Sequence, residues 1–205
     1  MTSLPIRDQL NDQLLTPKNS MLIIIDYQPV QVASIASMDR KHLVDNIVRV
    51  AKIARIYELP IMLSTVNVNN GINKPTISQL QEVLTGIEPL DRTTINAWED
   101  EEFVKAVKAT GRKKLIMTAL WTEACLTFPS LDAIRDGYEV YPVVDAVAGT
   151  SIEAHQAGLK RIIQAGGKPT SWVQLICELQ RDWNRKETVQ SFKPILFEPV
   201  EPWNE

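Results

Sequence analysis

Apolar runs alternate with helix-spaced apolar positions along this chain. Residues 21–26 (MLIIID) form a continuous apolar run that ends in a carboxylate, a pattern typical of a parallel strand buried on both faces. Comparable runs predict strands at 60–66, 113–120, 138–147 and, more briefly, around 169–173. Helical spacing and helix-end signals predict helices at 42–59, 76–84, 99–110, 123–137 (interrupted near Pro129), 151–167 and 174–185. Residues 88–98 are expected to be extended or irregular, and residues 184–205 to form an aperiodic tail.

This alternation predicts an α/β fold with a mostly parallel sheet that is covered by helices on both faces. The chain has 205 residues, of which 44% are hydrophobic, and we find no internal repeat or linker. We therefore expect one domain, 1–205, with a lead-in at 1–20 and a tail at 184–205. Ligands of such sheets bind outside the carboxyl ends of the strands. The positions to examine are Asp26, the segment after Val66, residues 120–125 and Asp145.

Charge and composition exclude several classes of partner. The chain carries 22 basic and 25 acidic residues, with no basic block of the kind that nucleic acid or an anionic membrane requires. No apolar run reaches the roughly 18 residues that a membrane span needs, and residues 1–20 lack the apolar core of a signal peptide. We expect a cytoplasmic protein without nucleic-acid or membrane partners. In a reducing compartment Cys125 and Cys177 are expected to be free thiols.

Three side chains could carry chemistry, and each has an ordinary alternative. Asp26 at a strand end is either a helix cap or a catalytic base. Cys125 lies just after a strand and near a helix N-terminus, where backbone N–H groups would lower the pKa of a thiol, but a lone cysteine is often only a small buried hydrophobe. Arg92 alone would be a surface arginine.

Other common chemistries have little support in the sequence. His42 and His155 both fall on helices away from the predicted strand ends, and no cluster has metal-ligand spacing. Neither GxGxxG nor GxxxxGK[ST] occurs, so nucleotide-binding loops are not indicated. We expect no metal and no cofactor. The chemistry would have to use Asp26, Cys125 and a nearby cation.

The ordered set of motifs is more specific than its parts. LIIIDYQ, a basic residue before INAW, and LIMTALWTEACLTFPSLDAIRDGYEVYPVVDA together resemble the isochorismatase-like cysteine hydrolase superfamily. The resemblance runs from about residue 21 to residue 183, and SWVQLICELQRDW is similar to the signature of the octameric YcaC-type subgroup. It implies a Rossmann-like three-layer sandwich and a hydrolase.

The resemblance also assigns roles by position. It makes Asp26 the catalytic base and Cys125 the nucleophile, and it implies a non-proline cis peptide bond between Leu120 and Trp121. The backbone N–H groups of Trp121 and Cys125 would then form an oxyanion hole.

This sequence departs from the family pattern at two positions. Arg92 is the basic residue nearest to the place of the family lysine; it keeps the positive charge but cannot shuttle a proton, because its pKa stays above about 12. Ala119 replaces the usual glycine of the element that carries the cysteine. STVNVNNG lacks the Asp-x-His of the nicotinamidase branch, so zinc is not expected.

The favoured hypothesis is a metal-independent cysteine hydrolase that cleaves a C–N, amide-type bond of a small molecule through a thioacyl-enzyme, with Arg92 balancing charge. One alternative is a degenerate member that acts as an oligomeric scaffold or binding protein, which the change from lysine to arginine would favour. Another is a thiol sensor in which Cys125 is oxidised and Cys177 approaches it in space.

The remaining predictions concern the pocket and the assembly. Candidate substrate-binding residues are Gln28, Asn96, Trp98, Trp121 and Phe128, although the tryptophans could equally pack in the core or at an interface. Asp145 is expected to cap a helix or to accept a hydrogen bond from a residue that itself contacts the substrate. A homo-oligomer, possibly an octamer, is implied by the resemblance and fits the apolar side chains of the tail segment, which are Trp183, Phe192, Ile195, Leu196, Phe197 and Trp203.

Overall fold

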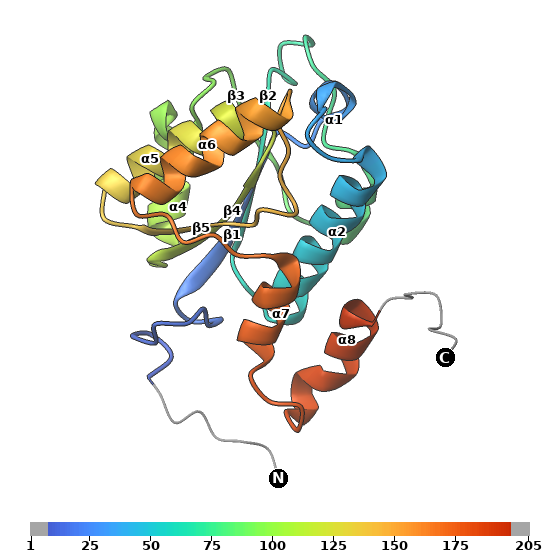
Figure 1. Ribbon diagram of the computed structural model, residues 1–205, viewed down its shortest axis with the longest axis vertical. Coiled ribbons are helices and arrows are strands. Elements are labelled where there is room, and N and C mark those ends of the chain that lie inside the picture. Colours follow the sequence, from blue (N-terminus) through green and yellow to red (C-terminus); the bar gives the residue numbers. More distant parts are fainter. Residues whose placement is uncertain (1–7, 198–205) are drawn as a thin grey trace.

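A five-stranded parallel sheet forms the centre of the molecule, with strand order β3-β2-β1-β4-β5 (Figure 1). The computed structural model describes residues 8–197, and the segments 1–7 and 198–205 lie outside the described residues. The strands are β1 (Ser20–Ile25), β2 (Ile61–Val66), β3 (Leu90–Arg92), β4 (Lys114–Ala119) and β5 (Glu139–Pro142). The predicted α/β fold with a parallel sheet is confirmed.

Helices cover both faces of this sheet (Figure 1). Their bounds are α1 (Pro29–Ser34), α2 (Arg40–Ile56), α3 (Ser78–Val83), α4 (Glu101–Ala109), α5 (Thr127–Arg135), α6 (Ile152–Gln164), α7 (Trp172–Gln180) and α8 (Lys186–Leu196). A 3₁₀ turn, η1 (Ala97–Glu99), precedes α4, and a π-helix, η2 (Thr122–Leu126), runs directly into α5. Helices α2, α7 and α8 pack on one side, and α4, α5 and α6 on the other.

The apolar run of β1 shows why both faces are covered. All six residues of β1 are buried, and their side chains alternate between two cores. Leu22 and Ile24 join the core under α2, whereas Ile23 and Ile25 join the core under α4 and α5. A strand that is apolar at every position needs helices on both of its sides. This double cover leaves the carboxyl edge of the sheet as the place where polar side chains can gather.

Several local predictions were wrong. No strand forms at 169–173; Thr170 makes only an isolated bridge to Val143, and Ser171 caps α7 with its hydroxyl. The helix around residues 123–137 is not broken at Pro129, which stands in the first turn of α5, where a proline is tolerated. The short strand β3 and the helix α1 were not predicted.

The C-terminal tail is also more regular than predicted. Residues Lys186–Leu196 form α8, which buries Val189, Phe192 and Ile195. These three positions have helical spacing, and Pro194, in the last turn, does not prevent the helix. Trp203 and the rest of 198–205 lie outside the described residues. Within residues 8–197, no helix is both long and apolar enough to cross a membrane.

Candidate active site

Asp26, Arg92 and Cys125 meet at the carboxyl edge of the sheet. Asp26 directly follows β1, Arg92 ends β3, and Cys125 lies in the π-helix just after β4. Asp26 has a left-handed backbone (φ 62°), and its N–H donates to the carbonyl of Ser64 at the end of β2 (3.0 Å). A positive φ is uncommon for a residue with a side chain, although aspartate tolerates it better than most. This backbone turn leaves the Asp26 side chain completely buried.

A buried ion pair joins the first two of these residues. Arg92 Nη2 donates to Asp26 Oδ2 at 2.8 Å, and neither side chain is exposed to solvent. Asp26 Oδ1 and the Nε and Nη1 atoms of Arg92 have no hydrogen-bond partner among the described residues. The expectation that Arg92, taken alone, would be a surface arginine was therefore wrong. Its charge is held beside the one carboxylate of the site.

Asp91 explains how Arg92 is held in place. Its carboxylate accepts hydrogen bonds from the N–H groups of Val68 and Asn69 and from the Thr65 hydroxyl, at 2.8–3.1 Å. The loop that follows β2 is thereby fastened to β3 one residue before Arg92. Sequence reasoning missed Asp91, because an acidic residue in a polar stretch gives no distinctive signal.

Cys125 lies inside the π-helix rather than at the start of an α-helix. Its side chain is buried, with 7% of the residue exposed. The peptide bond between Leu120 and Trp121 is cis. The backbone N–H of Trp121 is near enough to the Cys125 thiol to lower its pKa, against the larger effect of burial. π-Helical turns inside helices are rare and are frequently found at functional sites.

The pKa values of the pair are both shifted upward. Burial raises the pKa of Asp26 to about 6, against the opposing effects of the Arg92 charge and the Cys125 thiol. Burial, followed by the charge of Asp26, raises the pKa of Cys125 to about 12, although Arg92 and the Trp121 N–H oppose this. The expected lowering of the thiol pKa by a helix N-terminus was wrong, because loss of hydration outweighs the dipole.

These shifts define the resting state of the site. Between pH values of about 6 and about 12, Asp26 and Cys125 together hold one proton, and the thiol is its resting place. The carboxylate, the guanidinium and the neutral thiol then sum to zero charge. The arrangement is a neutral nucleophile beside a carboxylate that can accept its proton.

Two of the predicted substrate-binding residues lie close to Cys125 along the chain. Trp121 is partly buried, and its indole N–H donates to the hydroxyl of Ser34 at the end of α1 (2.9 Å). Phe128 is also partly buried, in the first turn of α5, and it packs on neither apolar core. Both remain candidates for substrate contact.

Gln28 does not offer its amide to a ligand. Its Nε2 donates to the carbonyls of Val66 and Lys74, and its Oε1 accepts from the N–H of Val66. The side chain is completely buried. Both amide hydrogens tie α1 to β2 and to the loop that follows it, so a structural role accounts for Gln28, and its binding of substrate stays a prediction.

Asn96 and Trp98 are likewise engaged in structure. Asn96 caps η1 through the N–H of Trp98 (3.1 Å) and donates to Asp132 (2.7 Å). The Trp98 indole donates to Asp136 (2.9 Å) and packs edge-on against Tyr138, with ring centroids 5.4 Å apart. Capping and packing account for both side chains, and their role in substrate binding stays a prediction.

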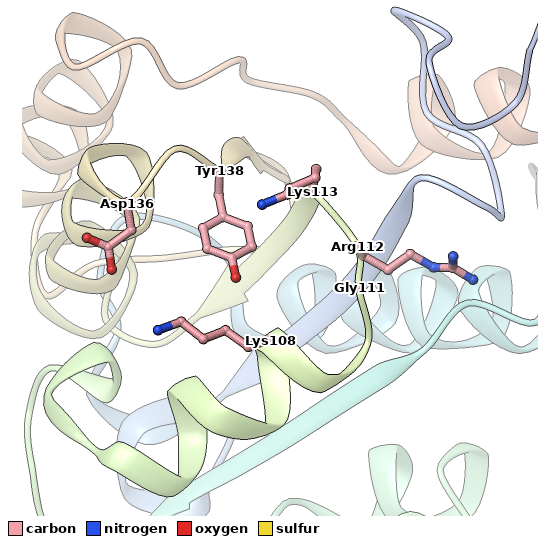
Figure 2. A pocket seen from close by; sticks show the side chains of 6 residues that line it. All are labelled: Lys108, Gly111, Arg112, Lys113, Asp136 and Tyr138. Atoms are coloured by element: carbon pink, nitrogen blue, oxygen red, sulfur yellow. The ribbon is translucent and has the colours of Figure 1, made fainter.

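A surface hollow beside Tyr138 lies at the opposite edge of the sheet from Asp26, Arg92 and Cys125. Figure 2 shows Lys113 directed towards the Tyr138 ring and Lys108 extending past the ring towards the side of Asp136, with Arg112 turned away. The hollow has a volume of about 570 Å³ and lies where β4 and β5 begin, opposite to the edge that carries Cys125. Lys108 in the last turn of α4 is favoured by the helix dipole, and Lys113 rests 5.3 Å above the Tyr138 ring.

Sequence reasoning also missed the surroundings of His155. Its Nδ1 lies 2.8 Å from the hydroxyl of Thr122, the first residue of the π-helix. The prediction that both histidines lie away from the site is therefore wrong for His155.

Asp145 accepts from the N–H of Trp172, the first residue of α7, so it acts as the predicted cap.

Metal-ligating side chains do not gather anywhere in residues 8–197: no group of three or more His, Cys, Asp or Glu is placed to hold an ion. Both cysteines are free, Cys125 buried and Cys177 exposed. The residues that are brought together suit covalent chemistry by a thiol.

A protein-family model and a named relative both match this chain over most of its length. Residues 20–174 match the family model described as the isochorismatase domain. The chain is 32% identical over 170 residues to the protein named "Probable hydrolase YcaC" of Escherichia coli strain K12, covering 82% of this chain and 81% of that protein.

Solved structures show the same similarity. YcaC from Pseudomonas aeruginosa, whose structure holds hexane-2,5-diol and covalent acrylamide, has a TM-score of 0.86 at 32% identity and covers 92% of each chain. YcaC from Escherichia coli, an octameric hydrolase of unknown specificity, has a TM-score of 0.81 at 28% identity, covering 91% of this chain and 96% of that one.

Proposed function

We propose that this chain, which belongs to the isochorismatase family, is a metal-independent cysteine hydrolase that cleaves a C–N, amide-type bond of a small molecule. Membership of this family supports hydrolase activity. The observation that carries the finer proposal is the buried Asp26–Arg92 ion pair beside the buried thiol of Cys125. These three side chains supply a nucleophile, a base and a compensating positive charge in a site that is shielded from water.

The first half-reaction forms a thioester. Asp26 takes the proton of the Cys125 thiol while Sγ bonds to the carbonyl carbon, and the carbonyl electron pair moves to oxygen. When this pair returns, the C–N bond breaks and the leaving nitrogen takes the proton from Asp26. The amine departs, and Asp26 is again a carboxylate beside Arg92.

The second half-reaction reverses these roles. Asp26 accepts a proton from water, and the resulting hydroxide attacks the thioester carbon. The C–S bond then breaks, the acid product leaves, and the sulfur recovers its proton from Asp26. One carboxylate therefore acts as base and as acid in each half, which suits a group whose pKa is raised to about 6.

Backbone amides are the proposed partners of the developing oxyanion. The N–H of Trp121 already acts on the Cys125 sulfur, so it lies beside the atom to which the carbonyl carbon will bond. The Cys125 N–H is the second proposed donor. Each such donor contributes about 3 to 4 kcal/mol to transition-state stabilisation in well-studied hydrolases.

Arg92 supplies charge and moves no proton. When Asp26 holds the thiol proton, the carboxylate charge disappears, and the guanidinium then faces the negative charge on sulfur or on the carbonyl oxygen. An arginine stays protonated throughout, so Asp26 is the sole proton carrier. The change from lysine to arginine at this place is compatible with catalysis under this scheme.

The relatives support a reactive thiol. Acrylamide is a neutral electrophile that alkylates thiols, and it is covalently bound in YcaC from Pseudomonas aeruginosa, which shares 32% identity with this chain. Acrylamide is also a small amide. We propose that Cys125 of this chain reacts with it.

The test compares cysteine variants on a panel of small primary and N-substituted amides. Cys125→Ala and Cys125→Ser should abolish release of amine or ammonia and retain the wild-type melting temperature, while Cys177→Ser, which changes the exposed thiol, should keep full activity. Acid-quenched wild-type enzyme should show the mass of the thioacyl adduct. Full turnover in a Cys125 variant would refute the scheme.

A catalytically silent member that acts as an oligomeric scaffold is the second candidate. The observation that favours it is the raised pKa of the buried Cys125, which makes the resting thiol a poor nucleophile without help from Asp26. An unreactive Cys125 together with no turnover on the amide panel would establish this alternative.

We also propose a homo-oligomer, because the Escherichia coli relative is octameric. An exposed aromatic pair is available: Trp183 lies in the connection between α7 and α8, and Phe197 directly follows α8. Trp183 and Phe197 are 56% and 61% exposed, and their rings are stacked with centroids 6.2 Å apart. Two adjacent exposed aromatic rings are typical of a protein–protein contact.

A further inference from the structure

Helix α6 approaches the π-helix that carries Cys125 unusually closely. A Cβ atom added to Gly158 would lie 2.8 Å from Thr127 Oγ1 and 3.0 Å from both Thr122 O and Glu123 Cα. Only a glycine therefore fits at this crossing. The backbone of the π-helix rests directly on α6 on the side away from the sheet.

Thr122, the first residue of the π-helix, is held by all of its polar atoms. Its N–H donates to the carbonyl of Ala148 (2.9 Å), and its carbonyl accepts from the Thr127 hydroxyl (2.6 Å). Its own hydroxyl lies 2.8 Å from Nδ1 of His155 on α6. Thr122 is completely buried, so water cannot replace a lost partner.

Glu123, the next residue of the π-helix, is also held by side-chain hydrogen bonds. Glu123 Oε1 accepts from the N–H of Thr150 (3.0 Å) and from its hydroxyl (2.6 Å). The other oxygen, Oε2, is buried against Gly149, where a Cβ would lie only 2.5 Å away. Among these contacts, the Thr122–His155 hydrogen bond joins the π-helix to α6 through two side chains, so it can be removed without changing the backbone.

We propose that His155 is a positioning residue: its hydrogen bond to Thr122 fixes the rotation of the π-helix so that the Cys125 thiol faces Asp26. This inference rests on the proposed function, because it assigns His155 a role in the reactivity of that thiol. Thr122 and Cys125 belong to the same short helical segment, so a rotation at Thr122 moves Sγ. A small misplacement of a reacting atom is costly in a preorganised site.

The test uses alkylation by acrylamide, which needs no knowledge of the natural substrate. The second-order rate at Cys125 is measured by peptide mass spectrometry, with the exposed Cys177 as internal standard. Thr122→Val removes the hydroxyl at nearly constant shape, and Thr122→Ser keeps it. His155→Leu removes the imidazole, and His155→Asn places an amide atom where Nδ1 stood. Thr188→Val, which removes the hydrogen bond from Thr188 of α8 to Gln180 at the end of α7, is the matched control.

We expect Thr122→Val and His155→Leu to lower the Cys125 rate at least about 10-fold relative to Cys177. Thr122→Ser and His155→Asn should restore it to within about threefold of wild type, and Thr188→Val should leave it unchanged. Wild-type reactivity in both Thr122→Val and His155→Leu, whatever their melting temperatures, would overturn the inference alone. An unreactive Cys125 in the wild-type protein would overturn the proposed function and this inference with it.

Discussion

The guanidinium of Arg92 donates to the carboxylate of Asp26 across 2.8 Å, and both side chains are completely shielded from solvent. A buried ion pair of this kind is poor evidence for stability, because desolvation of both charges offsets their attraction. The main effect of the pair is on the pKa of Asp26. The positive charge lowers a pKa that burial alone would raise further.

Replacing Arg92 should therefore shift the acid limb of the pH–rate profile, which is the pH range in which Cys125 alkylation slows as the pH falls. In Arg92→Gln the lowering influence of the guanidinium disappears, so the Asp26 pKa rises above about 6 and the rate of Cys125 alkylation begins to fall at a higher pH. In Arg92→Lys, which keeps a positive charge, the limb should stay near that of the wild type. An unchanged limb in Arg92→Gln would show that the two side chains are not coupled.

The same variants should differ in stability. Breaking a buried pair by removing one partner costs about 3 to 5 kcal/mol. We expect Arg92→Gln to lose stability of this order at pH 7, because the buried Asp26 must then either stay ionised without its partner or take up a proton, and Arg92→Lys to lose less. Urea unfolding followed by circular dichroism measures both losses, and equal stability of Arg92→Gln and wild type would contradict the buried pair.

Gln28 should prove to be structural. Gln28→Met keeps the approximate shape but removes hydrogen bonds to Val66 and Lys74, which should destabilise the fold by about 1 to 3 kcal/mol. The loop after β2 should also become more sensitive to limited proteolysis. Once a substrate is known, its KM should be affected less than the stability. A large rise in KM with unchanged stability would restore Gln28 as a substrate-binding residue.

Gly158→Ala tests the close approach of α6 to the π-helix. The added methyl group would press on backbone atoms of Thr122 and Glu123 at 3.0 Å, so we expect a loss of about 1 to 3 kcal/mol. Gln156→Ala, at an exposed position of the same helix, is the control and should change little. A stabilised Gly158→Ala variant, as helix propensity alone would predict, would show that the contact can relax.

The exposed aromatic pair of Trp183 and Phe197 should be needed for assembly. Trp183→Glu places a charge in the exposed ring pair, and multi-angle light scattering should then show a smaller particle than the wild-type oligomer. Lys186→Glu nearby changes charge without removing an aromatic ring and serves as the control. An unchanged mass in Trp183→Glu would exclude this surface from the interface.

Asp26 and Cys125 could be singled out from the sequence because each follows an apolar run that is buried on both faces, and the family resemblance then supplied their expected roles. Such a run ends at the carboxyl edge of the sheet, and position along the chain then translates directly into position in space. The same reasoning placed Asp145 correctly as a cap for α7.

Residues in irregular segments were harder to place. Arg92 ends a strand of three residues, too short to give a periodic signal, and its burial depends on pairing with β2. Gln28, Asn96 and Trp98 have the polarity and size of pocket residues, but their hydrogen bonds go to loops and caps that the sequence does not specify. The role of His155 depends on how α6 crosses the π-helix, which is a matter of tertiary packing.

The most direct measurement is the pH dependence of Cys125 alkylation by acrylamide in wild type and in Asp26→Asn, with Cys177 as the internal standard. The account predicts that the buried Cys125 reacts faster than the exposed Cys177 at pH 7, and that its rate falls as the pH drops through about 6, because Asp26 then holds a proton and cannot act as base. In Asp26→Asn this limb should disappear and the rate should fall by about 100-fold or more. A Cys125 that reacts no faster than Cys177, with the same profile in both proteins, would contradict the account.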